Sequence, residues 1–297
     1  MRTNREHLRF VGYRVTMHKE TKAEVLATLR DGVRHLERGG VATQSFETKG
    51  FSLLEEGAVF DQTPPQIDRG ALHEIRGAEH RDRPAAFGFL LALIARSWAV
   101  EETDPRPVLW CEDLAGSFDF GRLYAPGLKA FGLNPERFIV VRAKGSDELL
   151  WAMEEGVRSG SLCAVVGAFG GSGSSRRSDL DLTASRRLQL AAERSGTTAF
   201  LLRQPLDDLA SVARTRWLIS ARPSGQDIKK TIIGLPRWQV SLSKCRGGRP
   251  GTWDMEWNYA THHFHLVPAV ENRPVLPEYG SRGEPQRGTV THLRRTG

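Results

Sequence analysis

Two different hydrophobic periods run along this chain of 297 residues. Between residues 70 and 220, short continuous apolar runs alternate with longer segments whose apolar positions recur at helical spacing. Continuous apolar runs are typical of strands buried on both faces, and the longer segments are typical of the helices that cover them. The pattern therefore predicts an α/β fold with a mostly parallel sheet flanked by helices. The expected strands are 71–75, 108–111, 137–142, 161–167, 198–202 and 216–220, and the expected helices are 84–100, 120–131, 147–159 and 183–195.

The segments on either side follow other patterns. In 20–38, Val25, Leu29 and Val33 share one helical face before Gly39 ends the periodicity, which predicts an N-terminal helix. After Pro236 the period changes to two, in runs around Trp238 and Trp257, which predicts an antiparallel β-hairpin. Residues 263–266 are expected to add a third strand. Four parts follow: an N-terminal helix and linker (1–68), a core (69–236), a β-hairpin extension (237–270) and a disordered basic tail (271–297).

Composition narrows the class of protein. Apolar residues make up 39% of the chain and charged residues 26%, which supports a folded core. Neither an apolar run of about 18 residues nor a hydrophobic leader is present, so we expect a cytoplasmic protein. The cysteines Cys111, Cys163 and Cys245 lie far apart and form no CxxC pair, which predicts free thiols and no structural zinc site.

The segment after the first expected strand has the context of a phosphate-binding loop but not its residues. A GxxxxGK[ST] loop cradles phosphates with backbone N–H groups, a lysine and a Mg²⁺-binding hydroxyl. Counting from Gly77, the second glycine position holds Asp82, the lysine position Arg83 and the hydroxyl position Pro84. Asp82 brings negative charge, and Pro84 removes both a hydroxyl and an amide donor. The segment therefore predicts a plain strand-to-helix turn without a bound cofactor.

A second requirement of ATP hydrolysis also fails. A Walker B strand ends in an aspartate that holds Mg²⁺, whereas the strand at 161–167 ends in Gly167 and is followed by Ala168. Glu112 follows the strand at 108–111, and some ATPases carry at such a strand end a glutamate that polarises the attacking water. It is a candidate relic of that residue, but a solvent-facing carboxylate at a strand end is the favoured interpretation. We expect no catalytic residues and no enzymatic activity.

Several motifs together carry a resemblance to a known family. They are Gly70-Ala71-Leu72-His73-Glu74-Ile75-Arg76-Gly77, Val140-Val141-Arg142-Ala143, Leu150-Trp151-Ala152-Met153-Glu154-Glu155-Gly156, the run from Asp181 to Glu193, and Lys244-Cys245-Arg246-Gly247-Gly248-Arg249-Pro250-Gly251. On these motifs the chain, over about residues 70 to 268, resembles the ImuA family, whose members look like shortened relatives of the RecA recombinase. The resemblance implies a RecA-like core.

The resemblance also implies a function. It implies an accessory role in SOS-induced, mutagenic translesion DNA synthesis after DNA damage. The implied partners are an ImuB-like protein and an error-prone DnaE-type polymerase, with RecA and single-stranded DNA as further candidates. The departures at Asp82, Arg83 and Pro84 put ATP-driven filament formation in doubt.

Charge adds candidate contacts to DNA. The formal net charge is +7, and a basic balance favours nucleic acid or an acidic protein partner. The candidates are Arg176 and Arg177 in a Gly- and Ser-rich loop and Lys244, Arg246 and Arg249 at the expected hairpin tip, because such loops bring cations to phosphates. An ordinary disordered loop is the equal alternative for the first of these segments.

The aromatic and histidine residues near the hairpin suggest other sites. The period-two spacing of Trp238, Trp253 and Trp257 favours core positions over base stacking. His263 and His265 share one strand face, but no Cys, Asp or Glu ligand is close in sequence, so no metal site is expected.

The residues are also compatible with two other functions. One is a divergent DNA-dependent ATPase that uses Arg83 and Glu112. The other is a cell-division inhibitor similar in fold to SulA.

Overall fold

A ten-stranded mixed sheet organises the protein. The computed structural model describes residues 13–16, 27, 50–55, 63–100, 106–114, 122–170, 180–204, 210–224 and 234–267. The strands lie in the order β1-β4-β3-β5-β6-β2-β7-β8-β9-β10. Their bounds are β1 Tyr13–Thr16, β2 Leu72–Gly77, β3 Val108–Asp113, β4 Phe138–Ala143, β5 Ala164–Ala168, β6 Thr198–Arg203, β7 Thr215–Arg222, β8 Arg237–Cys245, β9 Gly251–Asn258 and β10 His263–Leu266.

The pairing confirms the predicted RecA-like α/β fold. All neighbours from β1 to β7 pair in parallel, and β7 to β10 pair antiparallel. The parallel strands β3, β4 and β6 are buried along their whole length, which explains their continuous apolar sequences. β6 lies between β2 and β5, so the strand before the former phosphate loop and the Walker B-like strand are not neighbours.

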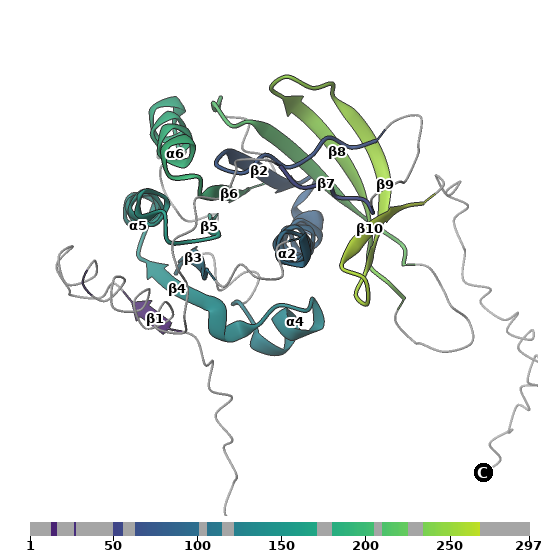
Figure 1. The fold of residues 1–297 in the computed structure, drawn as a ribbon, viewed down its shortest axis with the longest axis horizontal. Coiled ribbons are helices and arrows are strands. Elements are labelled where there is room, and N and C mark those ends of the chain that lie inside the picture. The colour runs from purple at the N-terminus through teal and green to yellow at the C-terminus, as the bar shows by residue number, and fades with distance from the viewer. Residues whose placement is uncertain are drawn as a thin grey trace, which may run out of the picture. The chain divides into compact units, whose positions relative to one another are not determined.

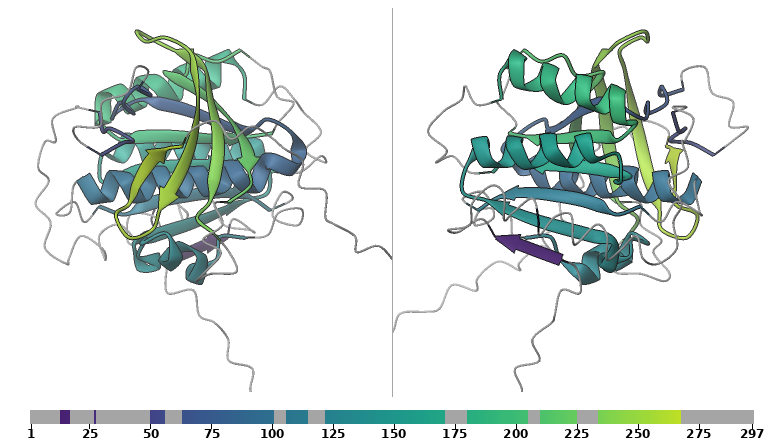
Figure 2. Two further views of the ribbon diagram at one scale, coloured as in Figure 1. Left: turned by 90° about the vertical axis from the view of Figure 1, so that its right-hand side faces the viewer. Right: turned by 60° about the vertical axis from the view of Figure 1, so that its left-hand side comes forward.

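Helices cover both faces of the sheet. α5 (Ser146–Ser159) and α6 (Leu182–Ser195) lie on one face and α2 (Arg83–Val100) on the other, as Figures 1 and 2 show. α4 (Ala125–Ala130) and the 3-10 turns η1 (His80–Asp82) and η2 (Pro135–Arg137) complete the described elements. The expected helix at 120–131 is thus shorter within the described residues.

The α2 helix is enclosed on two sides. The antiparallel strands β7 to β10 curl around it, so that it lies between them and the parallel sheet (Figure 2). This position explains why α2 is apolar around its whole circumference. The segment His80–Val100 is long and apolar enough to cross a membrane by composition alone, with mean hydropathy 1.2, but 56% of it is buried inside the protein. It is the central helix of the core.

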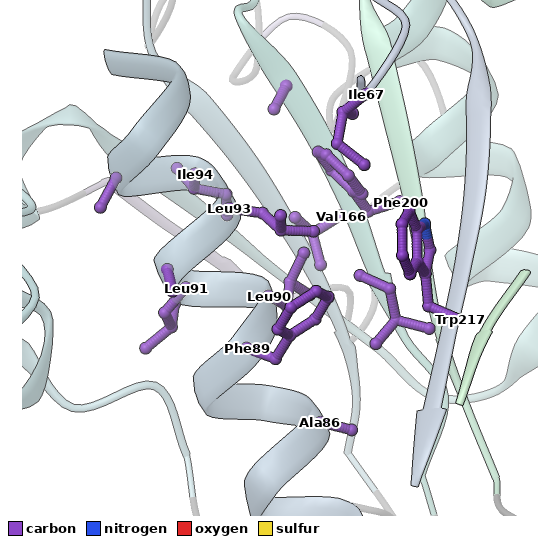
Figure 3. Close-up of a cluster of buried hydrophobic side chains, with 14 of the residues drawn as sticks. Ile67, Ala86, Phe89, Leu90, Leu91, Leu93, Ile94, Val166, Phe200 and Trp217 are labelled. Atoms are coloured by element: carbon purple, nitrogen blue, oxygen red, sulfur yellow. The ribbon is translucent and has the colours of Figure 1, made fainter. Parts of the chain in front are cut away.

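The aromatic residues of the extension belong to that core. Trp238, Trp253 and Trp257 are buried, which confirms the core prediction for all three. Phe89 of α2 packs edge-on against Trp238, with ring centroids 5.9 Å apart, and also contacts Trp217. Figure 3 shows Phe89 and Leu90 on the side of α2 that faces Trp217, with Leu91 on the opposite side.

Glycines allow α5 to approach the sheet closely. A Cβ atom at Gly156 of α5 would overlap the Leu109 side chain, and one at Gly167 of β5 would overlap the Met153 sulfur. A larger residue at either position would force the Leu109 or Met153 side chain to move, so packing and not backbone conformation favours glycine there.

The N-terminal part differs from the expectation in two places. Residues 13–16 form the edge strand β1, which the sequence pattern did not predict. Phe51, Leu53 and Leu54 of the weakly patterned stretch are buried in the core, and Leu54 forms a bridge to Phe264 of β10. The helix expected at 20–38 lies outside the described residues except for Ala27, which is helical. The tail from residue 271 lies wholly outside them.

Candidate functional site

The loop after β2 is held closed by hydrogen bonds within it and by one to β7. The Ala78 N–H donates to the Ile219 carbonyl at 2.8 Å, and the Asp82 N–H donates to the Glu79 carbonyl at 3.0 Å. The Arg83 N–H donates to the His80 carbonyl. These amides are therefore directed at protein acceptors, whereas a phosphate loop directs its amides at the ligand.

Gly77 shows how tightly the loop is folded. A Cβ atom there would lie 2.8 Å from the Arg83 nitrogen and 2.8 Å from the Asp82 carbonyl carbon. The start of α2 thus packs directly on the end of β2, in the space that a cradle would leave for a phosphate.

Asp82 supplies the negative charge of this loop. Its carboxylate is buried and accepts the Glu79 N–H at 3.2 Å and the Ala221 N–H of β7 at 2.9 Å. It lies directly before the first residue of α2, where the helix dipole favours an anion. The Asp82 carboxylate therefore places a negative charge at the N-terminus of α2, and two backbone amides of the protein already donate to it.

Arg83 points toward the end of β5. Its guanidinium is buried and donates from Nη2 to the Phe169 carbonyl at 2.6 Å. Pro84, at the next position, is exposed and has no N–H to donate. The side chain at the lysine position thus connects α2 to the residue that follows the Walker B-like strand.

Glu112 is not the solvent-facing carboxylate that we expected. It is buried at the end of β3, and its Oε1 accepts from Arg142 Nε of β4 at 2.8 Å. The correction has a simple physical reason. β3 and β4 pair in parallel with Glu112 opposite Arg142, so the two charges meet at the same edge of the sheet.

Gly167 and Ala168 lie on different faces of the sheet. Gly167 is directed toward Met153 of α5, as described above, while Ala168 packs against the core on the α2 side. The β5 residue beside Glu112 in the register is Ala168. A Walker B aspartate would have to face the α2 side of the sheet. The residue of β5 on that side is Ala168, not Gly167.

The predicted basic contacts fall in two regions. Arg176 and Arg177 lie outside the described residues. Arg246 and Arg249 are exposed in the turn between β8 and β9. Lys244 is only partly exposed, because its Nζ donates to the Ser211 carbonyl at 2.7 Å.

A β-bulge decides the direction of Lys244. Arg216 pairs with Lys244, but Trp217 pairs with Leu242, so Ser243 is the extra residue. The bulge places Lys244 on the face of Arg216, away from the core. Burial, followed by the nearby charge of Arg216, lowers the pKa of Lys244 below its ordinary value.

The described basic turn lies at the edge of the sheet where β7 begins. The segment with Arg176 and Arg177 follows the carboxyl end of β5, whereas β8 ends level with the start of β7.

Sequence reasoning missed a buried ion-pair network beneath Lys244. Glu74 of β2 accepts from Arg203 Nη1 at 2.9 Å and from Arg216 Nε at 2.8 Å. Glu74 and Arg203 are 1% and 2% exposed. The available signal was a glutamate in the middle of β2, a strand that the sequence predicts to be buried.

The cysteines and histidines were the remaining candidates from the sequence. Cys111, Cys163 and Cys245 are free thiols, as predicted. Among the described residues, no group of three His, Cys, Asp or Glu side chains is arranged to hold a metal ion.

Comparison with known proteins gives one clear similarity. The chain is 33% identical over 228 residues to Protein ImuA from two strains of Caulobacter vibrioides, and the match covers 72% of this chain and 86% of the relative. No protein-family model matches the chain.

Proposed function

The chain belongs to the ImuA family, and from this premise we propose that it acts as a non-catalytic RecA-like accessory protein in SOS-induced, mutagenic translesion DNA synthesis. Its partners in this proposal are an ImuB-like protein and an error-prone DnaE-type polymerase. The role is that of an adaptor: the fold supplies surfaces for partner proteins and for DNA, and no step depends on ATP.

The Asp82 carboxylate carries the non-catalytic part of the proposal. It lies at the N-terminus of α2 and accepts two backbone amides, from Glu79 and Ala221. An incoming triphosphate would meet this carboxylate in place of the amides and the lysine that normally bind it. The ion pair between Glu112 and Arg142 supports the same conclusion, because it engages the carboxylate that would otherwise orient water.

Calorimetric titration with ATP and Mg²⁺ tests this part. We expect no binding up to about 1 mM nucleotide, a limit that corresponds to about 4 kcal/mol of binding free energy. A RecA recombinase titrated under the same conditions is the positive control. Clear binding would favour the divergent ATPase that uses Arg83 and Glu112.

In this proposal the exposed turn between β8 and β9 contacts single-stranded DNA. Arg246 and Arg249 are exposed there, next to Lys244. Each phosphate contact that is lost lowers the slope of log affinity against log salt by about 0.7 for single strands. We therefore expect Arg246→Ala with Arg249→Ala to weaken binding and to reduce that slope.

Fluorescence anisotropy at several salt concentrations measures this effect. Arg158→Ala is the matched control, because Arg158 is an exposed arginine, 57% accessible, on α5. Arg176→Ala with Arg177→Ala is measured separately, since these two residues belong to a different segment of the chain. Unchanged affinity and slope in both double variants would remove DNA from the proposal.

A tagged pull-down after DNA damage tests the partners. We expect recovery of the ImuB-like protein and the DnaE-type polymerase. Recovery of FtsZ in their place would favour a cell-division inhibitor.

A further inference from the structure

An apolar groove runs beside α2 and has no part in the contacts described so far. It has a volume of about 360 Å³ and lies between α2, α4 and the start of β8. Pro84, Phe87 and Leu91 line it from one side of α2, at positions that share a helical face. The volume lies within the range of pockets that bind ligands in proteins, about 300–1,000 Å³.

Two glycines within helices line this groove, Gly88 of α2 and Gly127 of α4. Both have ordinary helical backbone, since neither is among the glycines with positive φ. A Cβ atom at Gly88 would lie 3.4 Å from Trp238 and 3.7 Å from Phe131, and one at Gly127 would lie 3.6 Å from Tyr124. These are ordinary van der Waals distances, so alanine fits at both positions.

The protein's own stability does not explain these glycines. Glycine in a helix is less stable than alanine because it loses more backbone freedom on folding. Gly156 of α5 is different, because a Cβ atom there would overlap Leu109. At Gly88 and Gly127 the effect of the missing methyl group is a deeper groove, which lets another chain approach the two helices closely.

The lining indicates the chemistry of that other chain. Apart from Arg122, every described residue of the groove is uncharged, and most are apolar or aromatic. Tyr124 is 59% exposed at the groove, and tyrosine and arginine are residues enriched at protein interfaces. Arg122 is exposed and favours a carboxylate opposite it. The net charge of +7 also favours an acidic partner.

We propose that this groove docks a segment of a partner protein that carries apolar side chains and at least one carboxylate, with the carboxylate paired to Arg122. The apolar side chains fill the space over Gly88 and Gly127, in the manner of an amphipathic segment in a groove. The inference rests on the proposed function, because an adaptor has to bind partner proteins.

The experiment uses the full chain with purified ImuB-like protein and purified DnaE-type polymerase from the same bacterium as probes. Affinities are measured by surface plasmon resonance for the wild type, for Gly88→Ala with Gly127→Ala, and for Arg122→Glu. We expect both variants to bind the recognised probe about tenfold or more weakly. The melting temperature of the glycine variant is expected to be unchanged or higher, so weaker binding would not reflect unfolding.

Leu190→Ala is the control variant. Leu190 is an exposed apolar residue, 42% accessible, on α6 at the other face of the sheet. Its affinity for both probes is expected to equal that of the wild type.

The outcomes separate this inference from the proposed function. If the wild type binds a probe and the groove variants bind it equally well, the groove is not the docking site, and the proposed function stands. If the wild type binds neither probe, the proposed function fails and the docking site fails with it. If the groove variants instead convert a dimer of this chain to a monomer in analytical ultracentrifugation, the occupant is a second copy, and the inference of an acidic partner is overturned.

Discussion

Glu74 lies in the middle of β2 and, among the described residues, is the most deeply buried carboxylate that pairs with an arginine. It accepts from Arg203, which is 2% exposed, and from Arg216, which is 17% exposed. We expect Glu74→Gln to be strongly destabilising, because it removes the carboxylate from two arginines that remain charged. Removing one partner of a buried ion pair typically costs about 3–5 kcal/mol. That is a large part of the whole stability of an ordinary domain, about 5–15 kcal/mol.

Urea denaturation followed by tryptophan fluorescence measures this loss, with the free energy of unfolding extrapolated to water. Glu155→Gln is the matched control. Glu155 pairs with the exposed Arg158 at 3.4 Å, and an exposed pair contributes about 1 kcal/mol or less.

A second variant separates the charge effect from a packing effect. Glu74→Leu combined with Arg203→Met removes both deeply buried charges, and we expect it to recover most of the lost stability. Buried pairs can often be replaced by apolar residues of similar volume at little cost. If Glu74→Gln is as stable as Glu155→Gln, the Glu74 carboxylate does not stabilise the charges of Arg203 and Arg216, and this reasoning is refuted.

Three further predictions follow from single contacts. His73 is buried, with Nε2 at 2.8 Å from the Asp68 carbonyl and Nδ1 at 2.7 Å from the Thr215 hydroxyl, and burial lowers its pKa from 6.5 to about 4. Because only the unfolded chain binds this proton between those values, stability is full above pH 6.5 and falls by about 3 kcal/mol toward pH 4. Urea unfolding at pH 7 and pH 4.5 should show a smaller difference for His73→Gln than for the wild type; an equal difference would contradict the assignment. Gly156→Ala should lower the free energy of unfolding by about 1–3 kcal/mol because the core becomes overpacked, and the melting temperature should fall. An unchanged melting temperature would mean that α5 shifts freely. Asp82→Ala should lower the free energy of unfolding in urea by about 1–3 kcal/mol, because two amides lose their acceptor. Asp82→Asn keeps one acceptor and should lower it less. Equal losses in the two variants would argue against these hydrogen bonds.

The local pattern of the chain was sufficient for most elements of the fold. The continuous apolar strands, the helices and the period-two hairpin follow from side-chain periodicity, which the backbone geometry imposes directly. The burial of α2 was predictable in this way. A helix that is apolar on every side has to be enclosed, and the parallel sheet and the strands β7–β10 enclose it. The burial of Trp238 and Trp257 follows from the same reasoning.

The candidate site was predictable only in part. The substitutions at Asp82, Arg83 and Pro84 are visible in the sequence, and they identify an altered phosphate loop. Their partners are not visible there. Asp82 accepts from Ala221 and Arg83 donates to the Phe169 carbonyl, and both partners lie far along the chain.

The tertiary structure alone decided how the charges are paired and where they face. Glu112 meets Arg142 because β3 and β4 are neighbours, and Lys244 turns away from the core because of one extra residue at Ser243. Periodicity records whether a side chain is buried, but it does not record which strand lies beside it. Strand order, register and bulges depend on contacts between distant segments, and these form only when the whole sheet is assembled.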